Sequence, residues 1–184
     1  MSKLDRTTLY FGTGDLRKML RFLSLASLMV AVSISAGSAQ NFAGCVESQA
    51  VDPPRTIYQC ANGLVLESEA AAALEINAGA GSPQVVRMEN DAVLIQLPPG
   101  GGAFEIRTPH AIAAVRGTEY IVDVTLEQTS VFVVRGKVAV SRANGSETVL
   151  LTQGEGADVA PGVPFAPVRW GVPRAEALLA RFGR

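Results

Sequence analysis

Short runs of alternating apolar and polar residues dominate the second half of the chain. Between residues 104 and 159 these runs are separated by turns that contain glycine, as at 135–136 and 144–145. An Asn-Gly dipeptide at 62–63 separates two earlier runs in the same way, and this dipeptide is the strongest short signal for a β-hairpin. Strands of about five residues that recur at intervals of about 8–12 positions predict an all-β fold.

We therefore expect a sandwich or β-roll of about 9–12 short strands, with a short helix near the C-terminus. No helical period competes with the strand pattern inside 100–160. A loop is expected at 78–83, where glycine and alanine alternate. The runs that predict strands are 56–60, 64–67, 74–77, 84–88, 92–97, 104–107, 112–116, 120–125, 131–134, 137–141, 148–152 and 157–159.

The tail at 163–184 has a different pattern. Its prolines at 164, 167 and 173 predict an extended connection. The apolar residues that follow, at 175, 178, 179 and 182, are spaced as on one face of a helix. We expect a helix from Arg174 to Phe182 that docks on the sheet, with Trp170 as an anchor.

The N-terminal segment has the three parts of a secretory signal peptide. Arg17, Lys18 and Arg21 precede an apolar run over 22–34, and small residues follow it up to Ala39. The run is short for a membrane span, which needs about 20 residues. We predict a signal peptide at 1–39, with cleavage between Ala39 and Gln40 and with Met19 as the true start. An uncleaved membrane anchor is the alternative.

Two cysteines, Cys45 and Cys60, follow the predicted cleavage site. An even number of cysteines in an oxidising compartment favours a disulfide. Such a bond would tie an N-terminal arm at 40–55 to the first hairpin of a β domain at 56–162, and closing a loop of this length is worth roughly 3 kcal/mol. A weaker alternative is a lipoprotein site at 42–45, Phe-Ala-Gly-Cys.

Charge and composition restrict the class of partner. Residues 40–184 contain 11 basic and 15 acidic residues, a net charge of −4. Binding to nucleic acid needs a basic face, so no nucleic-acid partner is expected. Two cysteines and one histidine do not complete a tetrahedral metal site without carboxylate help, so neither a metal nor a cofactor is expected.

Candidate catalytic residues are few. His110 is the single histidine, and no serine lies in a G-x-S-x-G context. We expect the His110 ring to hydrogen-bond the backbone where a strand begins. Glu119 and Asp123 share one face of a predicted strand, and paired carboxylates can act as acid and base. The simpler interpretation, which we adopt, places both on a solvated face, so no enzyme activity is predicted.

Arg116 is the most informative charged residue. By alternation it shares a strand face with Ile112 and Ala114, which suggests that it is partly buried and paired with a carboxylate, since a buried arginine needs a partner. The alternative is that Arg116 contacts a binding partner. Gly117 after it indicates a bulge or a close approach of two backbones.

Three stretches together resemble the core of a FecR-type domain: TPHAIAAVRGTEYIVDV at 108–124, TSVFVVRGKVAVS at 129–141 and VLLTQGEGADV at 149–159. The resemblance is best over 104–160. The two-cysteine arm and the ending ARFGR are similar to those of secreted single-domain members. The residues that match the family pattern in order and spacing are Thr108, Pro109, Val115, Arg116, Gly117, Thr118, Gly136, Val138, Gly154 and Glu155.

This resemblance implies an all-β periplasmic domain without catalytic residues. In the best-understood members the domain follows a cytoplasmic anti-sigma segment and a membrane span, and relays the state of an iron-siderophore receptor. Only 21 residues precede the apolar run here, so we expect a signal, where one exists, to pass through another protein. We predict a periplasmic or secreted module that binds an envelope protein by a strand edge or a sheet face, with Arg116, Gly117, Thr118 and Tyr120 as candidate contacts. Binding to envelope glycan or peptidoglycan is the alternative.

Overall fold

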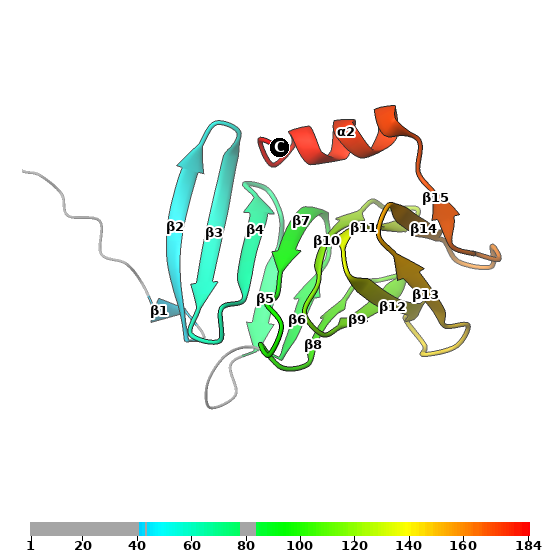
Figure 1. Cartoon of the computed structure of the whole chain (residues 1–184), viewed down its shortest axis with the longest axis horizontal. Coiled ribbons are helices and arrows are strands. Elements are labelled where there is room, and N and C mark those ends of the chain that lie inside the picture. The colour runs from blue at the N-terminus through cyan, green and yellow to red at the C-terminus, as the bar shows by residue number, and fades with distance from the viewer. Residues whose placement is uncertain (1–40, 43, 78–83) are drawn as a thin grey trace, which may run out of the picture. The chain divides into compact units, whose positions relative to one another are not determined.

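Two β-sheets and one helix make up the described part of the chain, residues 41–42, 44–77 and 84–184, in a computed structural model (Figure 1). The predicted signal peptide with its cleavage site at Ala39 and Gln40, and the loop expected at 78–83, lie outside these residues. Within them, no helix is long and apolar enough to cross a membrane.

The larger sheet has nine strands, in the order β1-β2-β3-β4-β7-β10-β11-β14-β15. Their bounds are β1 Asn41–Phe42, β2 Cys45–Val51, β3 Pro54–Cys60, β4 Val65–Glu69, β7 Asp91–Gln96, β10 Glu119–Val124, β11 Thr129–Arg135, β14 Glu155–Val159 and β15 Val168–Arg169. Every neighbouring pair in this sheet is antiparallel.

The smaller sheet has six strands, in the order β13-β12-β9-β8-β6-β5. Its strands are β5 Leu74–Asn77, β6 Val85–Met88, β8 Phe104–Arg107, β9 Ala111–Val115, β12 Lys137–Arg142 and β13 Val149–Thr152. The pairing of β6 with β8 is parallel, whereas the other pairs are antiparallel.

The main apolar core lies between the two sheets. Strand β9 shows the alternation that builds it, because Ala111, Ala113 and Val115 are buried while Ile112 and Ala114 are half-buried on the opposite face. Successive side chains of a strand point to opposite faces, so each strand contributes every second residue. The all-β sandwich predicted from the sequence is confirmed.

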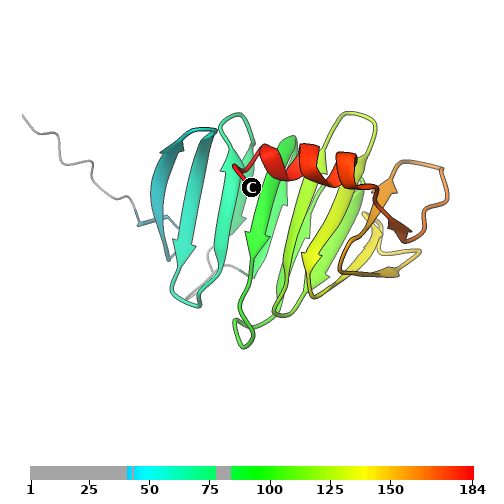
Figure 2. The same cartoon turned by 45° about the horizontal axis from the view of Figure 1, so that its top comes forward.

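Helix α2, Val172–Ala180, adds a third layer on the outer face of the nine-stranded sheet (Figure 2). A second apolar cluster lies beneath it, made of Ala92, Leu94, Ile121, Phe132, Trp170, Leu178 and Phe182. The middle strands β7, β10 and β11 are therefore buried on both faces, which explains their nearly continuous apolar sequence. The predicted docking of the helix and the anchoring role of Trp170 are confirmed, and the Trp170 ring stacks on Phe132 with 4.9 Å between centroids.

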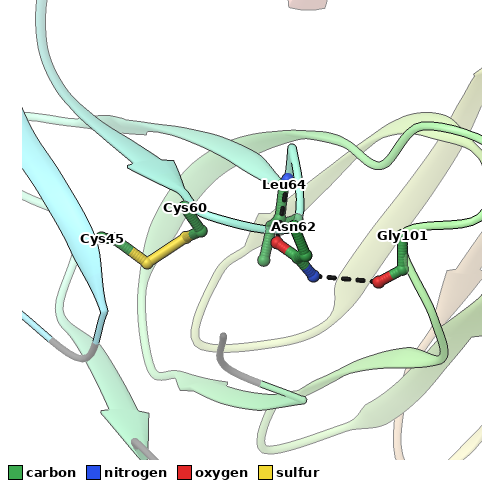
Figure 3. The surroundings of a disulfide bond; sticks show 5 residues. All are labelled: Cys45, Cys60, Asn62, Leu64 and Gly101. Atoms are coloured by element: carbon green, nitrogen blue, oxygen red, sulfur yellow. Dashed lines mark hydrogen bonds between the residues drawn. A yellow bond between two sulfur atoms is a disulfide. The ribbon is translucent and has the colours of Figure 1, made fainter. Parts of the chain in front are cut away.

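The disulfide between Cys45 and Cys60 joins two directly opposite residues of β2 and β3 (Figure 3). Beside it, the turn into β4 is fixed by Asn62. The Asn62 side chain donates to the Gly101 carbonyl at 2.9 Å and accepts from the Leu64 amide at 3.1 Å. The disulfide hairpin is thereby connected to the 98–102 loop of the domain.

The structure differs from the sequence prediction at both ends. The described residues contain 15 strands, above the expected 9–12, because β1, β2 and β15 were not predicted. The segment 40–55, predicted as an arm, supplies β2 and the start of β3 and so belongs to the nine-stranded sheet. Pro54 is tolerated there because a proline at the first residue of a strand need not donate a ladder hydrogen bond.

Candidate functional site

The outer face of the six-stranded sheet carries a shallow hollow of about 580 Å³. One row of cross-strand neighbours forms its floor: Leu150, Ala139, Ala114, Glu105 and Val85, from β13, β12, β9, β8 and β6. The two alanines lie at the centre of the row, and their short side chains leave space above the backbone. We call this row, with its cationic rim, the outer hollow.

Two cations, Arg116 and Lys137, form one rim of the outer hollow. Both side chains are exposed. Within the ranges that the structure describes, neither makes a side-chain hydrogen bond or an ion pair. Arg107, by contrast, is paired with Glu105 on the floor. Among the described residues, the rim at Arg116 and Lys137 therefore presents to solvent two positive charges that are not paired with a carboxylate.

The predicted partial burial of Arg116 is wrong. Strand β9 directs Ala111, Ala113 and Val115 into the core, so the face with Ile112 and Ala114 is the outer one. Because both faces of this strand are apolar, the sequence alone did not distinguish them. As an exposed cation beside a hollow, Arg116 fits the alternative interpretation, contact with a partner.

Gly117 makes the close backbone approach that its position indicated. Its φ is +68°, and a Cβ there would lie 3.2 Å from the Cα of Pro99. This turn packs the Arg116 segment against the 98–102 loop. Gly117 thus sets the direction in which the chain leaves β9 and presents no side chain of its own.

Thr118 and Tyr120 do not line the outer hollow, because both side chains are fully buried. The Thr118 hydroxyl donates to the Lys137 carbonyl at 2.9 Å. Tyr120 points into the core between the sheets, and its hydroxyl has no hydrogen-bond partner among the described atoms. Burial, with a smaller contribution from Glu105, raises the pKa of Tyr120. Of the four predicted contact residues, Arg116 is the one that offers a side chain to a partner.

The two buried hydroxyls are expected to respond differently to removal. Thr118→Val deletes a donor and leaves the Lys137 carbonyl without it, so we expect a loss of about 0.5–1.5 kcal/mol of unfolding free energy. Tyr120→Phe deletes a hydroxyl without a partner and should be close to neutral. Urea unfolding of both variants measures this, and a larger loss for Tyr120→Phe would mean that its hydroxyl is hydrogen-bonded to buried water.

The His110 ring hydrogen-bonds a side chain and not, as we had expected, the backbone. Its Nδ1 lies 3.2 Å from the Thr129 hydroxyl. Glu119 and Asp123 do not lie on a freely solvated face, because Arg184 and Arg181 of the C-terminal segment pair with them at 3.1 and 2.9 Å. No group of three or more His, Cys, Asp or Glu side chains arranged to hold a metal occurs in the described ranges.

Fold and site together define a β-sandwich domain of two sheets, with a helix on one outer face and an exposed sheet face on the other. Residues 58–139 match the family model described as FecR protein. This match confirms the resemblance to a FecR-type domain that the sequence indicated. The match contains Arg116, Lys137 and most of the outer hollow, and it ends before Leu150 and helix α2.

Solved structures support the fold. Two crystal structures of a "putative anti-sigma factor" from Parabacteroides distasonis ATCC 8503, at 1.65 and 2.50 Å resolution, each superpose with a TM-score of 0.57. Their sequence identities are 19% and 18%, over 72% and 73% of this chain. The matched part spans 64% of each solved chain. No curated protein matches this chain.

Proposed function

We propose that this chain is a non-enzymatic FecR-domain module that binds an envelope protein through the outer hollow, as part of an extracytoplasmic signal relay. The observation that supports it most is the pair of exposed cations, Arg116 and Lys137, neither paired with a carboxylate of the described residues, beside a floor that has two alanines at its centre. The FecR domain supports a role in signalling, and an iron or siderophore signal is the type that the family suggests.

The chemistry of the outer hollow selects an extended protein segment with acidic side chains. Ala114 and Ala139 leave room for a backbone to approach the sheet, while Arg116 and Lys137 favour carboxylates, with which arginine forms paired hydrogen bonds. Such charged rims mainly set the rate and specificity of association. The outer hollow is less suited to a sugar, which commonly stacks on an exposed aromatic ring. Among the described lining residues Phe104 is the single aromatic one, and it is 2% exposed.

Charge reversal tests this proposal. The double variant Arg116→Glu, Lys137→Glu should lose a captured envelope protein that the wild-type domain retains, and the loss should exceed tenfold in affinity, about 1.4 kcal/mol. Arg169→Glu is the matched control, since Arg169 is an exposed arginine of β15 in the other sheet. Retention of the same protein by the double variant would refute the site. If wild type and double variant both bind purified sacculi and sediment with them to the same extent, glycan binding would be supported instead.

We further propose that the chain is exported and cleaved after Ala39. Intact-mass measurement and thiol titration on protein from fractionated cells should give a periplasmic species that starts at Gln40 and has no free thiol. An uncleaved species in the membrane fraction would contradict this and support an anchor. A chain that starts at Cys45 with the added mass of lipid would show a lipoprotein, and the disulfide could not form in it.

A further inference from the structure

The outer face of the nine-stranded sheet is covered by residues 170–184, which contact it through two kinds of side chain. The apolar contacts come from Trp170, Leu178 and Phe182, which are 9%, 6% and 1% exposed. They pack on Ala92, Leu94, Ile121 and Phe132, in a cluster that is separate from the core between the sheets. We call the sheet surface beneath this segment the helix groove.

Three arginines of the segment pair with carboxylates of the groove. Arg174 donates to Asp158 on β14 at 2.9 Å. Arg181 donates to Glu69 on β4 at 2.8 Å and pairs with Asp123 on β10 at 2.9 Å. Burial acts to raise the pKa of Asp158, but hydrogen bonds from Arg174 and from the Ser130 hydroxyl outweigh it and lower this pKa.

The end of the chain completes this pattern. Arg184 pairs with Glu67 on β4 at 2.6 Å and with Glu119 on β10 at 3.1 Å. The groove therefore combines an apolar floor with carboxylates from three strands. Its chemistry complements a helix that has large apolar side chains on one face and arginines beside them.

Three features of the C-terminal segment favour its opening from the rest of the domain. Its connection, 160–167, is mostly exposed and contains three prolines. Helix α2 has nine residues, and an isolated helix of that length is marginal in water. The arginine side chains are 33–46% exposed, so water can solvate them when the segment opens. Opening of this segment would leave the core between the sheets intact.

We propose that the helix groove is a docking site for a basic amphipathic helix of a protein partner, and that residues 170–184 occupy it until such a helix displaces them. Displacement would leave Glu67, Glu69, Glu119, Asp123 and Asp158 without the arginines of this segment, beside exposed Phe132 and Ile121. A partner helix that supplies both arginines and apolar anchors satisfies these groups again. The helix groove lies on the opposite sheet from the outer hollow, and the two sites do not depend on each other.

Binding of a labelled peptide to the mature chain tests the proposal. The probe is a fluorescein-labelled peptide of residues 170–184. The wild-type chain should bind it weakly, because its own segment competes. The variant Arg181→Ala loosens that segment while leaving the groove unchanged, so the apparent affinity should rise about tenfold or more as the open fraction rises.

Two controls make the result specific. Adding Glu69→Gln and Asp123→Asn to the Arg181→Ala chain should return peptide binding to the wild-type level or below. A peptide with Arg174→Glu and Arg181→Glu should not bind the Arg181→Ala chain. Circular dichroism of each variant must show the β signal of the wild type, which separates loss of the site from loss of the fold.

Three outcomes would overturn the proposal. One is that the folded Arg181→Ala chain binds the peptide no better than the wild type does. Another is that the groove substitutions leave peptide binding unchanged, since the carboxylates would then not recognise the helix. Dimerisation of the Arg181→Ala chain without peptide binding would also overturn it, because the groove would then exchange helices between copies and not accept a partner.

Discussion

Replacing both cysteines, Cys45→Ala with Cys60→Ala, is expected to lower the free energy of unfolding by about 2–4 kcal/mol. The bond closes a loop of 15 residues in sequence separation, and its loss enlarges the unfolded ensemble. Both sulfurs are also buried in the main core, with Cys45 at 0% and Cys60 at 8% exposure. Urea unfolding under non-reducing conditions measures the effect.

Reduction of the wild-type chain is the matched control for this variant. Urea unfolding in the presence of a reductant should give nearly the same loss as the double substitution, because both remove the crosslink. An unchanged unfolding midpoint in the alanine variant would contradict the stabilising role of the disulfide. It would mean that pairing of β2 with β3 persists in the unfolded chain and already restricts the unfolded ensemble.

Gly156→Ala is expected to destabilise the chain by about 1–3 kcal/mol through overpacking. A Cβ at Gly156 would lie 2.4 Å from two atoms of the Trp170 ring and 2.7 Å from the Val131 carbonyl oxygen. Either the Trp170 ring leaves its stack on Phe132 or strands β11 and β14 move apart. Because Trp170 is the single tryptophan of the chain, its fluorescence should shift toward that of a solvent-exposed indole.

Gly171→Ala is the control for this prediction. A Cβ at Gly171 would lie 3.9 Å from Pro173, and the backbone there is extended with a φ of −66°, so alanine fits without strain. The stability of this variant should remain close to that of the wild type. Equal Trp170 fluorescence in Gly156→Ala and wild type would show that the Trp170 ring keeps its position when residue 156 carries a Cβ.

Most strands could be predicted because their determinants are local. Alternation and Asn-Gly turns located the strands from β3 to β14, and the helical spacing of Leu178, Leu179 and Phe182 located α2 to within two residues. Strand β2 was missed because its residues are mostly polar or exposed and two prolines follow it. Its position is fixed by pairing with β3 and not by a sequence period of its own.

The sites were harder to predict because they depend on contacts between distant residues. Arg184 pairs with Glu67, 117 residues away, and Arg181 with Glu69, 112 residues away. No local pattern connects such residues. The alternation of Tyr120 with Ile121 predicted a strand, but it did not show that Tyr120 is buried between the sheets or that Ile121 is buried beneath helix α2.

The outer hollow brings together residues from five strands, and the sequence drew attention to Arg116 alone among them. Ala114 and Ala139 carried a usable signal, since alanine is unusual on the exposed face of a strand. This signal can be interpreted only when it is known which face of β9 and β12 is exposed. The order of the strands, which places Ala114 next to Ala139, was needed to identify it.

A photo-crosslinking amino acid placed at Ala139 tests most directly whether the outer hollow binds a protein. In cells, the crosslinker at Ala139 should capture one envelope protein, and the same crosslinker at Leu126, a 96% exposed turn residue outside the hollow, should not. Arg116→Glu in the Ala139 chain should abolish the crosslink. Capture of the same protein from Leu126 alone, or capture at Ala139 that survives Arg116→Glu, would contradict the account.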